Sequence, residues 1–134
     1  MDENEKEFWS GLDSYLPELI VQMSSLAVKS YYSITNLKNG ITWWSQKAME
    51  YFGLESNYTV RGKERTSKGL HPDDVEIFKR GFAERVAGRN LDKPWEYRIK
   101  DGSAYSRFNA MARMLYDSDA KPYVMITRYV NYGL

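Results

Sequence analysis

The stretch "KPWEYRIKDGSAYSRFNAMARMLYDSDAKPYVMITRYVNYGL", residues 93–134, decides the fold. Its first run alternates apolar and charged residues, which is the pattern of a half-buried β-strand. One face carries Trp95, Tyr97 and Ile99, and the other carries Glu96, Arg98 and Lys100. Asp101-Gly102 and the polar run "DSDAKP" separate this strand from two longer apolar runs, Tyr105 to Tyr116 and Tyr123 to Tyr132. The sequence therefore predicts a meander of three antiparallel strands.

An earlier pair of β-rich runs lies at residues 30–36 and 41–44. Asn39-Gly40 separates the two runs, and this dipeptide suits the positive φ angles of a tight hairpin turn. Ser45 can then cap the first turn of the short helix in "QKAMEYFGL", and Gly53 can end that helix in a left-handed conformation. We expect a β-hairpin followed by a strand-to-helix corner.

The chain's one histidine opens "HPDDVEIFKRGFAERVAG", residues 71–88. Pro72 suits a first helical position, and the two aspartates after it lie where the helix dipole favours negative charge. Apolar residues then recur at three- and four-residue spacing, at Val75, Phe78, Phe82 and Val86. A metal site would need at least three converging ligands, and the chain has no cysteine and no second histidine. We therefore interpret His71 as part of a helix start.

Residues 55–70 are polar and carry two internal glycines and four basic residues. We predict a loop with short helical turns. Local runs of charge are usually solvated, and no aromatic residue interleaves the basic ones, so the pattern does not favour nucleic-acid binding.

The first 26 residues have apolar side chains at a helical spacing. These are Phe8, Leu12, Tyr15, Leu16, Leu19, Ile20, Met23 and Leu26. Pro17 lacks an amide donor, so the helix is either kinked there or divided in two, with Pro17 opening the second helix. We expect an N-terminal helical segment over residues 1–29 and a separate domain over residues 30–134.

Together these elements predict an α+β fold, a five-stranded antiparallel sheet with the helices of residues 45–88 on one face. The other face needs the N-terminal helix or a partner. Six large side chains are expected to point between helices and sheet as a ligand pocket: Phe52, Phe78, Phe82, Tyr97, Phe108 and Met125. Ordinary core packing is the alternative for each. Arg98 and Arg107 can pair with an anionic ligand or with surface carboxylates.

Composition narrows the function further. The 134 residues are 43% hydrophobic and 15% aromatic, which indicates one folded domain. Nineteen basic and eighteen acidic residues give a net charge of +1, so no overall field attracts nucleic acid or an anionic membrane. No run approaches the ~20 apolar residues of a membrane span, and the acidic start is unlike a signal peptide. We expect a cytoplasmic location.

The order of motifs resembles a PAS domain over residues 30–132. The motifs are "WWSQKAMEYFGL" after a hairpin, "HPDD" opening a long helix, "EYRIKDGS" at a strand turn and "YDSDAKPY" before the final strand. "WSQKAMEYFGL" with the chain end "VNYG" resembles PAS domains found ahead of GGDEF-type diguanylate cyclases in Gram-positive bacteria. The chain has Ser45 where asparagine is common, Ala120 where glycine is usual and Asn131 where an aspartate often begins the exit motif.

The resemblance implies a sensory module that binds a small ligand or mediates dimerisation and controls a separate output domain. For the subset with GGDEF domains, that output is a diguanylate cyclase in cyclic di-GMP signalling. No "GGDEF" run occurs in the sequence, so we expect catalysis to lie outside this segment. We also expect no cofactor, since covalent flavin photochemistry needs a cysteine and histidine-ligated haem would have to use His71.

Two alternatives remain. A small enzyme would use Tyr97, Asp101 or His71 for proton transfer in an apolar cavity. A purely structural homodimer would pack the N-terminal helix against its copy through Phe8, Leu12, Leu16 and Ile20.

Overall fold

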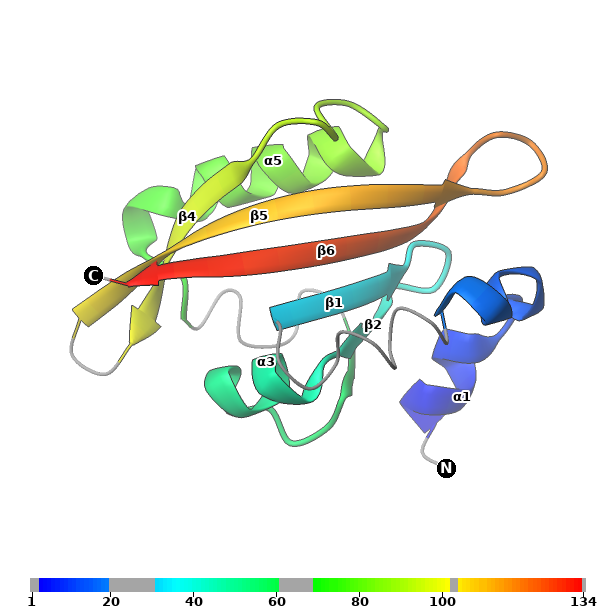
Figure 1. Ribbon diagram of the computed structural model, residues 1–134, viewed down its shortest axis with the longest axis horizontal. Coiled ribbons are helices and arrows are strands. Elements are labelled where there is room, and N and C mark those ends of the chain that lie inside the picture. Colours follow the sequence, from blue (N-terminus) through cyan, green and yellow to red (C-terminus); the bar gives the residue numbers. More distant parts are fainter. Residues whose placement is uncertain (1–2, 20–30, 61–68, 102–103, 134) are drawn as a thin grey trace.

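A computed structural model describes residues 3–19, 31–60, 69–101 and 104–133. The helical elements are α1 (Glu3–Trp9), η1 (Asp13–Tyr15), α3 (Gln46–Phe52), η2 (Pro72–Asp74) and α5 (Val75–Val86), and residues 16–19 are also helical. The strands are β1 (Tyr31–Asn36), β2 (Ile41–Trp44), β3 (Tyr58–Val60), β4 (Trp95–Asp101), β5 (Ala104–Tyr116) and β6 (Pro122–Gly133). They form one six-stranded sheet in the order β3-β2-β1-β6-β5-β4, in which β1 and β6 are neighbours (Figure 1). No helix in the described ranges is long and apolar enough to cross a membrane.

The predicted meander is confirmed. β4 pairs antiparallel with β5, and β5 pairs antiparallel with β6. Trp95, Tyr97 and Ile99 are buried, whereas Glu96 and Lys100 on the other face of β4 are exposed. The alternation of apolar and charged residues in β4 therefore predicted correctly which side chains are buried.

The predicted hairpin is also confirmed, but the sheet has six strands and not five. β1 and β2 are joined by residues 37–40, and Gly40 adopts a φ of 75°. The sixth strand is β3, which pairs with β2 at the edge of the sheet. β3 has only three residues, so alternation inside a polar stretch could not reveal it. Residues 61–68 of the predicted loop lie outside the described residues.

Both predicted helix starts are confirmed. The Ser45 side chain accepts a hydrogen bond from the Ala48 amide, and Gly53 ends α3 with a φ of 68°. His71 Nδ1 accepts a hydrogen bond from the Asp73 amide at 3.1 Å, immediately before η2 and α5. The imidazole therefore caps a helix, and Gly88 follows the end of α5 with a φ of 77°.

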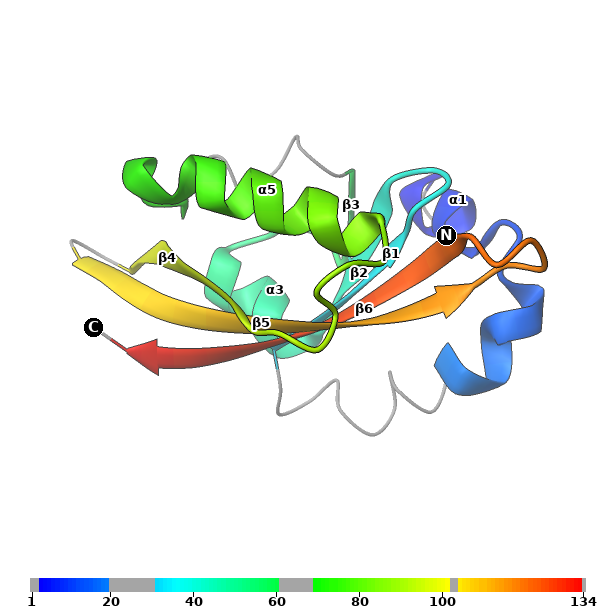
Figure 2. The ribbon, with the colours of Figure 1, turned by 90° about the horizontal axis from the view of Figure 1, so that it is seen from above.

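Helices α3 and α5 pack against one face of the sheet, which we call the inner face (Figure 2). The opposite, outer face is partly covered by the N-terminal segment, which was one of the two predicted alternatives. Phe8, Leu12 and Leu19 form one hydrophobic cluster with outer-face residues of β1 and β6, namely Ile34, Val124 and Ile126. The described part of the N-terminal segment therefore shares a core with the sheet. The domain boundary at residue 30 stays a prediction.

The N-terminal helix is broken at Gly11, which has a φ of 78°. The Tyr123 hydroxyl donates to the Gly11 carbonyl at 3.1 Å and leaves no room for a Cβ at that position. After this break, residues 16–19 are helical, and Pro17 is the second residue of this stretch. This position is close to the predicted alternative in which Pro17 opens a second helix.

The prediction that the N-terminal helix packs against a second copy of the chain is wrong for Phe8 and Leu12. Both side chains are fully buried in the chain's own core, because the outer sheet face beneath them is apolar. Leu16 is 39% exposed, and Ile20 lies outside the described residues.

Candidate functional site

The structure places all six predicted pocket residues between the inner sheet face and the helices. They come from α3 (Phe52), α5 (Phe78 and Phe82), β4 (Tyr97), β5 (Phe108) and β6 (Met125). Phe108, Tyr97 and Met125 are buried, and the three helix phenylalanines are partly buried. Their contact with a ligand stays a prediction.

Aromatic packing joins most of these residues. The Phe78 ring meets Tyr97 edge-on at 5.0 Å, and the Phe52 ring lies 5.9 Å from Phe108. Met125 belongs to a second cluster with Ala112 and Met114, and Phe82 packs against both clusters. The apolar half of the site is therefore a continuous layer beneath α3 and α5.

Buried hydroxyls line the inner face of β1, β2, β3 and β6. They belong to Ser33, Thr35, Thr42, Thr59 and Thr127. Four of these have side-chain partners: Thr35 bonds Thr42 at 2.9 Å, Ser33 bonds the Tyr129 hydroxyl at 2.8 Å, and the Trp44 indole donates to Thr59 at 2.8 Å. An apolar core would hold valine or isoleucine at such positions. We name these five residues the hydroxyl band.

Thr127 is the exception within the hydroxyl band. Its side chain is 1% exposed, and among the described residues its Oγ1 has no hydrogen-bond partner. A buried hydroxyl without a partner costs about 1–3 kcal/mol. Thr127 lies between Met125 and Tyr129 in β6, on the inner face of the sheet.

Sequence reasoning missed the hydroxyl band because it treats polar residues in an alternating strand as solvent-facing. Here Ser33 and Thr35 alternate with Ile34 and Asn36, and all four are buried because both sheet faces are covered at β1. The predicted layers could have revealed these buried hydroxyls. A strand that lies between helices on one face and the N-terminal segment on the other must bury both of its faces.

Arg85 is a second missed residue, and it fixes the inner helix to the sheet. Its guanidinium is buried, lies 5.1 Å from the Trp95 ring centre, and donates to the Gly81 and Lys93 carbonyls at 3.1 and 2.9 Å. Burial lowers the pKa of the Arg85 guanidinium. This residue anchors α5 beside the aromatic layer.

The residues considered for proton transfer have structural contacts. His71 caps a helix and lies 4.5 Å from the Tyr105 ring, while Tyr97 lies in the aromatic layer. The side chain of Asp101 lies outside the described residues. Within the described ranges, no three His, Cys, Asp or Glu side chains gather as metal ligands would.

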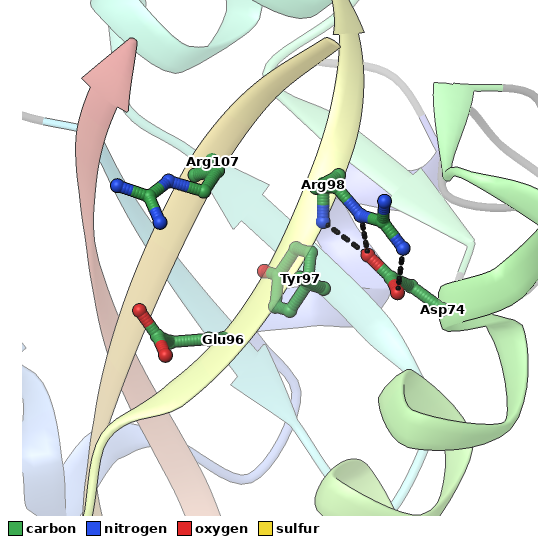
Figure 3. A pocket seen from close by; sticks show the side chains of 5 residues that line it. All are labelled: Asp74, Glu96, Tyr97, Arg98 and Arg107. Carbon is green, nitrogen blue, oxygen red and sulfur yellow. Dashed lines mark hydrogen bonds and ion pairs between the residues drawn. The ribbon is translucent and has the colours of Figure 1, made fainter. Parts of the chain in front are cut away.

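Arg98 pairs with a buried carboxylate and not with a surface one. Its Nε and Nη2 donate to the two carboxylate oxygens of Asp74 at 2.8 and 2.7 Å, and its backbone amide donates at 2.8 Å (Figure 3). These bonds lower the pKa of Asp74. Arg107 lies directly opposite Arg98 in the strand register, and both residues line a shallow outer hollow with Asp74, Glu96 and Tyr97.

Comparison with solved structures identifies the architecture. The N-terminal domain of a diguanylate cyclase with PAS/PAC sensor from Marinobacter aquaeolei has a TM-score of 0.63 at 14% identity, covering 78% of this chain and 96% of that one. The PAS domain of a protein from Colwellia psychrerythraea gives 0.58 at 10% identity, covering 89% and 98%. A sensory box histidine kinase/response regulator from Burkholderia thailandensis E264 gives 0.56 at 19% identity, covering 87% and 85%.

No protein-family model matches the sequence, and no curated protein matches it either. The likeness at these identities concerns the fold. The chain adopts the PAS fold, as its motif order predicts, and its structural neighbours include sensory domains of a histidine kinase and a diguanylate cyclase.

Proposed function

We propose that this chain is a cytoplasmic sensory domain that binds a small ligand between its inner sheet face and helices α3 and α5. The observation that carries this proposal is the unpaired, buried hydroxyl of Thr127, which lies in the hydroxyl band beside the aromatic layer. A buried hydroxyl without a partner destabilises a fully packed core, whereas in a binding site a ligand can supply its hydrogen bond.

The ligand's chemical class follows from the residues around it. Phe52, Phe78 and Phe108 offer aromatic surfaces, and the hydroxyl band offers neutral donors and acceptors. No charged residue other than Arg85 is buried on this side among the described residues, and its guanidinium already bonds two carbonyls. The site therefore fits a small, uncharged, largely aromatic molecule with one or two hydrogen-bonding groups.

A thermal-shift measurement tests this binding. Phenol and indole are suitable probes, alongside a panel of neutral aromatic molecules with one or two polar groups. A ligand selective for the folded state raises the melting temperature by mass action. Tryptophan fluorescence gives a second readout, because Trp44 contacts Phe52 and Trp95 contacts Phe78. If no member of the panel changes either signal, ligand sensing by this interior is rejected.

We further propose that the output is a diguanylate cyclase in the full-length protein. The chain end "VNYG" and the "WSQKAMEYFGL" motif support this output, as does the fold shared with the N-terminal domain of a diguanylate cyclase. Within the described residues the one buried carboxylate, Asp74, accepts hydrogen bonds from Arg98 on both oxygens, which favours a regulatory role over acid–base catalysis. Cyclic di-GMP formation from GTP by the full-length protein, with and without ligand, tests this assignment. A downstream sequence without a cyclase domain would refute it.

Dimerisation is a second candidate function, and exposed apolar side chains on the sheet favour it. Met111 and Val130 lie on the outer face, 41% and 37% exposed, and Tyr132 near the end of β6 is 58% exposed. Sedimentation velocity over a range of concentrations measures association directly. A Val130→Asp variant is expected to weaken a dimer that uses this surface, whereas a monomer at all concentrations excludes one.

A further inference from the structure

The outer hollow beside β4 and β5 holds two oppositely charged side chains that form no ion pair with any described residue. It is lined by Asp74, Glu96, Tyr97, Arg98 and Arg107. Its volume is about 190 Å³, which is below the ~300–1,000 Å³ of pockets for drug-sized ligands, so any occupant is small. Figure 3 shows the Asp74–Arg98 pair on one side of Tyr97 and the head groups of Glu96 and Arg107 on the other.

The strand register places Arg107 beside another arginine, and the described residues offer it no carboxylate partner. Arg98 and Arg107 are directly opposite each other, and like charges in that position repel. Asp74 neutralises Arg98 through a bidentate ion pair. Within the described residues, no carboxylate lies within 4.0 Å of the Arg107 guanidinium.

Glu96 supplies the complementary charge. It is exposed on β4 opposite Asn109, so it is the diagonal neighbour of Arg107. Side chains at diagonal positions are about 7–8 Å apart at their bases, within reach of one another. In the described structure Glu96 nevertheless has no cation within 4.0 Å. Among the described residues, the hollow therefore presents one anion and one cation that have no ion-pair partner.

We propose that this hollow binds a small zwitterion such as a free α-amino acid. Its carboxylate would lie on the Arg107 guanidinium, which offers two parallel N–H donors, and its ammonium group would lie on the Glu96 carboxylate. The adjacent Asp74–Arg98 pair is neutral and fixed, so it neither competes for nor repels the ligand. Because Glu96 and Arg107 are exposed, the affinity should fall as salt is added.

The test uses the isotope-labelled chain and follows backbone amide signals by NMR. Glycine is the zwitterionic probe, acetate tests the anion alone and methylammonium tests the cation alone. Glycine is expected to shift the amides of residues 96, 98 and 107 saturably, with an affinity at least tenfold above that of either single-charge probe. Binding of acetate as tight as that of glycine would overturn the zwitterion assignment, and the absence of saturable shifts would overturn the site.

Matched variants separate the two charges. Arg107→Gln and Glu96→Gln are each expected to weaken glycine binding at least tenfold, because each removes one of the two charge contacts. Arg128→Gln, another exposed arginine but on β6, should leave glycine binding unchanged. All three side chains are exposed, so unchanged melting temperatures will show that the variants fold. Retention of full affinity by Glu96→Gln would overturn the proposal. The interior variant Thr127→Val should not affect glycine binding, which keeps this site distinct from the proposed ligand interior.

Discussion

Asp74 holds Arg98 through three hydrogen bonds, two from the guanidinium and one from the backbone amide. The neighbouring His71 amide donates to the Arg98 carbonyl at 2.9 Å, and Leu70 forms a bridge with Ile99. Residues 70–74 therefore contact the free edge of β4 at Arg98 and Ile99, and they connect that edge to the start of α5. This connection links α5, on the inner face of the sheet, to β4, whose outer face carries Arg98.

Replacing Asp74 by Asn should destabilise the fold by roughly 1–3 kcal/mol, since it weakens charged hydrogen bonds at a buried site. Chemical denaturation measures this change in the free energy of unfolding. Asp73→Asn is the matched control, because Asp73 is exposed and its side chain accepts none of the Arg98 hydrogen bonds. Equal losses in both variants would contradict a specific role for the Asp74–Arg98 pair.

The same pair predicts a pH dependence. The hydrogen bonds from Arg98 lower the pKa of Asp74 below its ordinary value of 3.8. The folded state therefore binds this proton less readily than the unfolded state. The resulting stabilisation is fully present above about pH 4 and is lost as the pH falls through the lowered folded-state pKa. Denaturation curves across this acidic range should show a shallower pH slope for Asp74→Asn than for the natural chain.

Ala120 lies in the turn between β5 and β6 with a φ of 60°, a left-handed conformation that favours glycine. Glycine adopts this conformation without a steric penalty, so Ala120→Gly should remove strain and stabilise the fold by about 0.5–1 kcal/mol. Ala83→Gly in the exposed face of α5 is the control and should cost about 1 kcal/mol, since glycine is a poor helix former. A lower melting temperature for Ala120→Gly would contradict the expected relief of strain.

Gly81→Ala tests the contact between α5 and β4. Alanine normally stabilises a helix interior by about 1 kcal/mol relative to glycine. At this position a Cβ would lie 2.7 and 2.8 Å from two ring carbons of Trp95, so the ring must move. We expect a net loss of about 1–3 kcal/mol in urea denaturation. Gly69→Ala, whose Cβ would meet Ile99 at an ordinary 3.6 Å, should be tolerated.

Much of the sheet was predictable because its signal is local. The alternation of Trp95, Tyr97 and Ile99 and the long apolar runs after them define β4, β5 and β6 without reference to any partner. The helix starts at Ser45 and His71 were predictable for the same reason, since a capping side chain bonds an amide only two or three residues away.

The features that sequence reasoning missed depend on distant partners. β3 is a strand because β2 pairs with it, and the break at Gly11 accompanies a contact with Tyr123, 112 residues away. Asp74 was interpreted as a helix-start residue, and its role became visible only with Arg98 beside it. In each case a local pattern allows several outcomes, and the tertiary contact selects one.

Thr127→Val is the sharpest test of the proposed sensory interior. Valine keeps the shape of threonine and removes only the hydroxyl, whose Oγ1 is buried without a partner among the described residues. Removing an unsatisfied polar group should leave stability unchanged or raise it by up to about 1 kcal/mol. A ligand that hydrogen-bonds this hydroxyl should, however, lose at least tenfold in affinity, because one of its own polar groups is then left unpaired.

Thr35→Val is the matched comparison. Thr35 bonds Thr42 at 2.9 Å, so this change should destabilise the fold by leaving the Thr42 hydroxyl unpaired. If Thr127→Val binds phenol, indole or any other active probe as tightly as the natural chain does, Thr127 is not the group that recognises the ligand. If Thr127→Val instead destabilises the fold as much as Thr35→Val, its hydroxyl serves the core, and the argument for a ligand at this position fails.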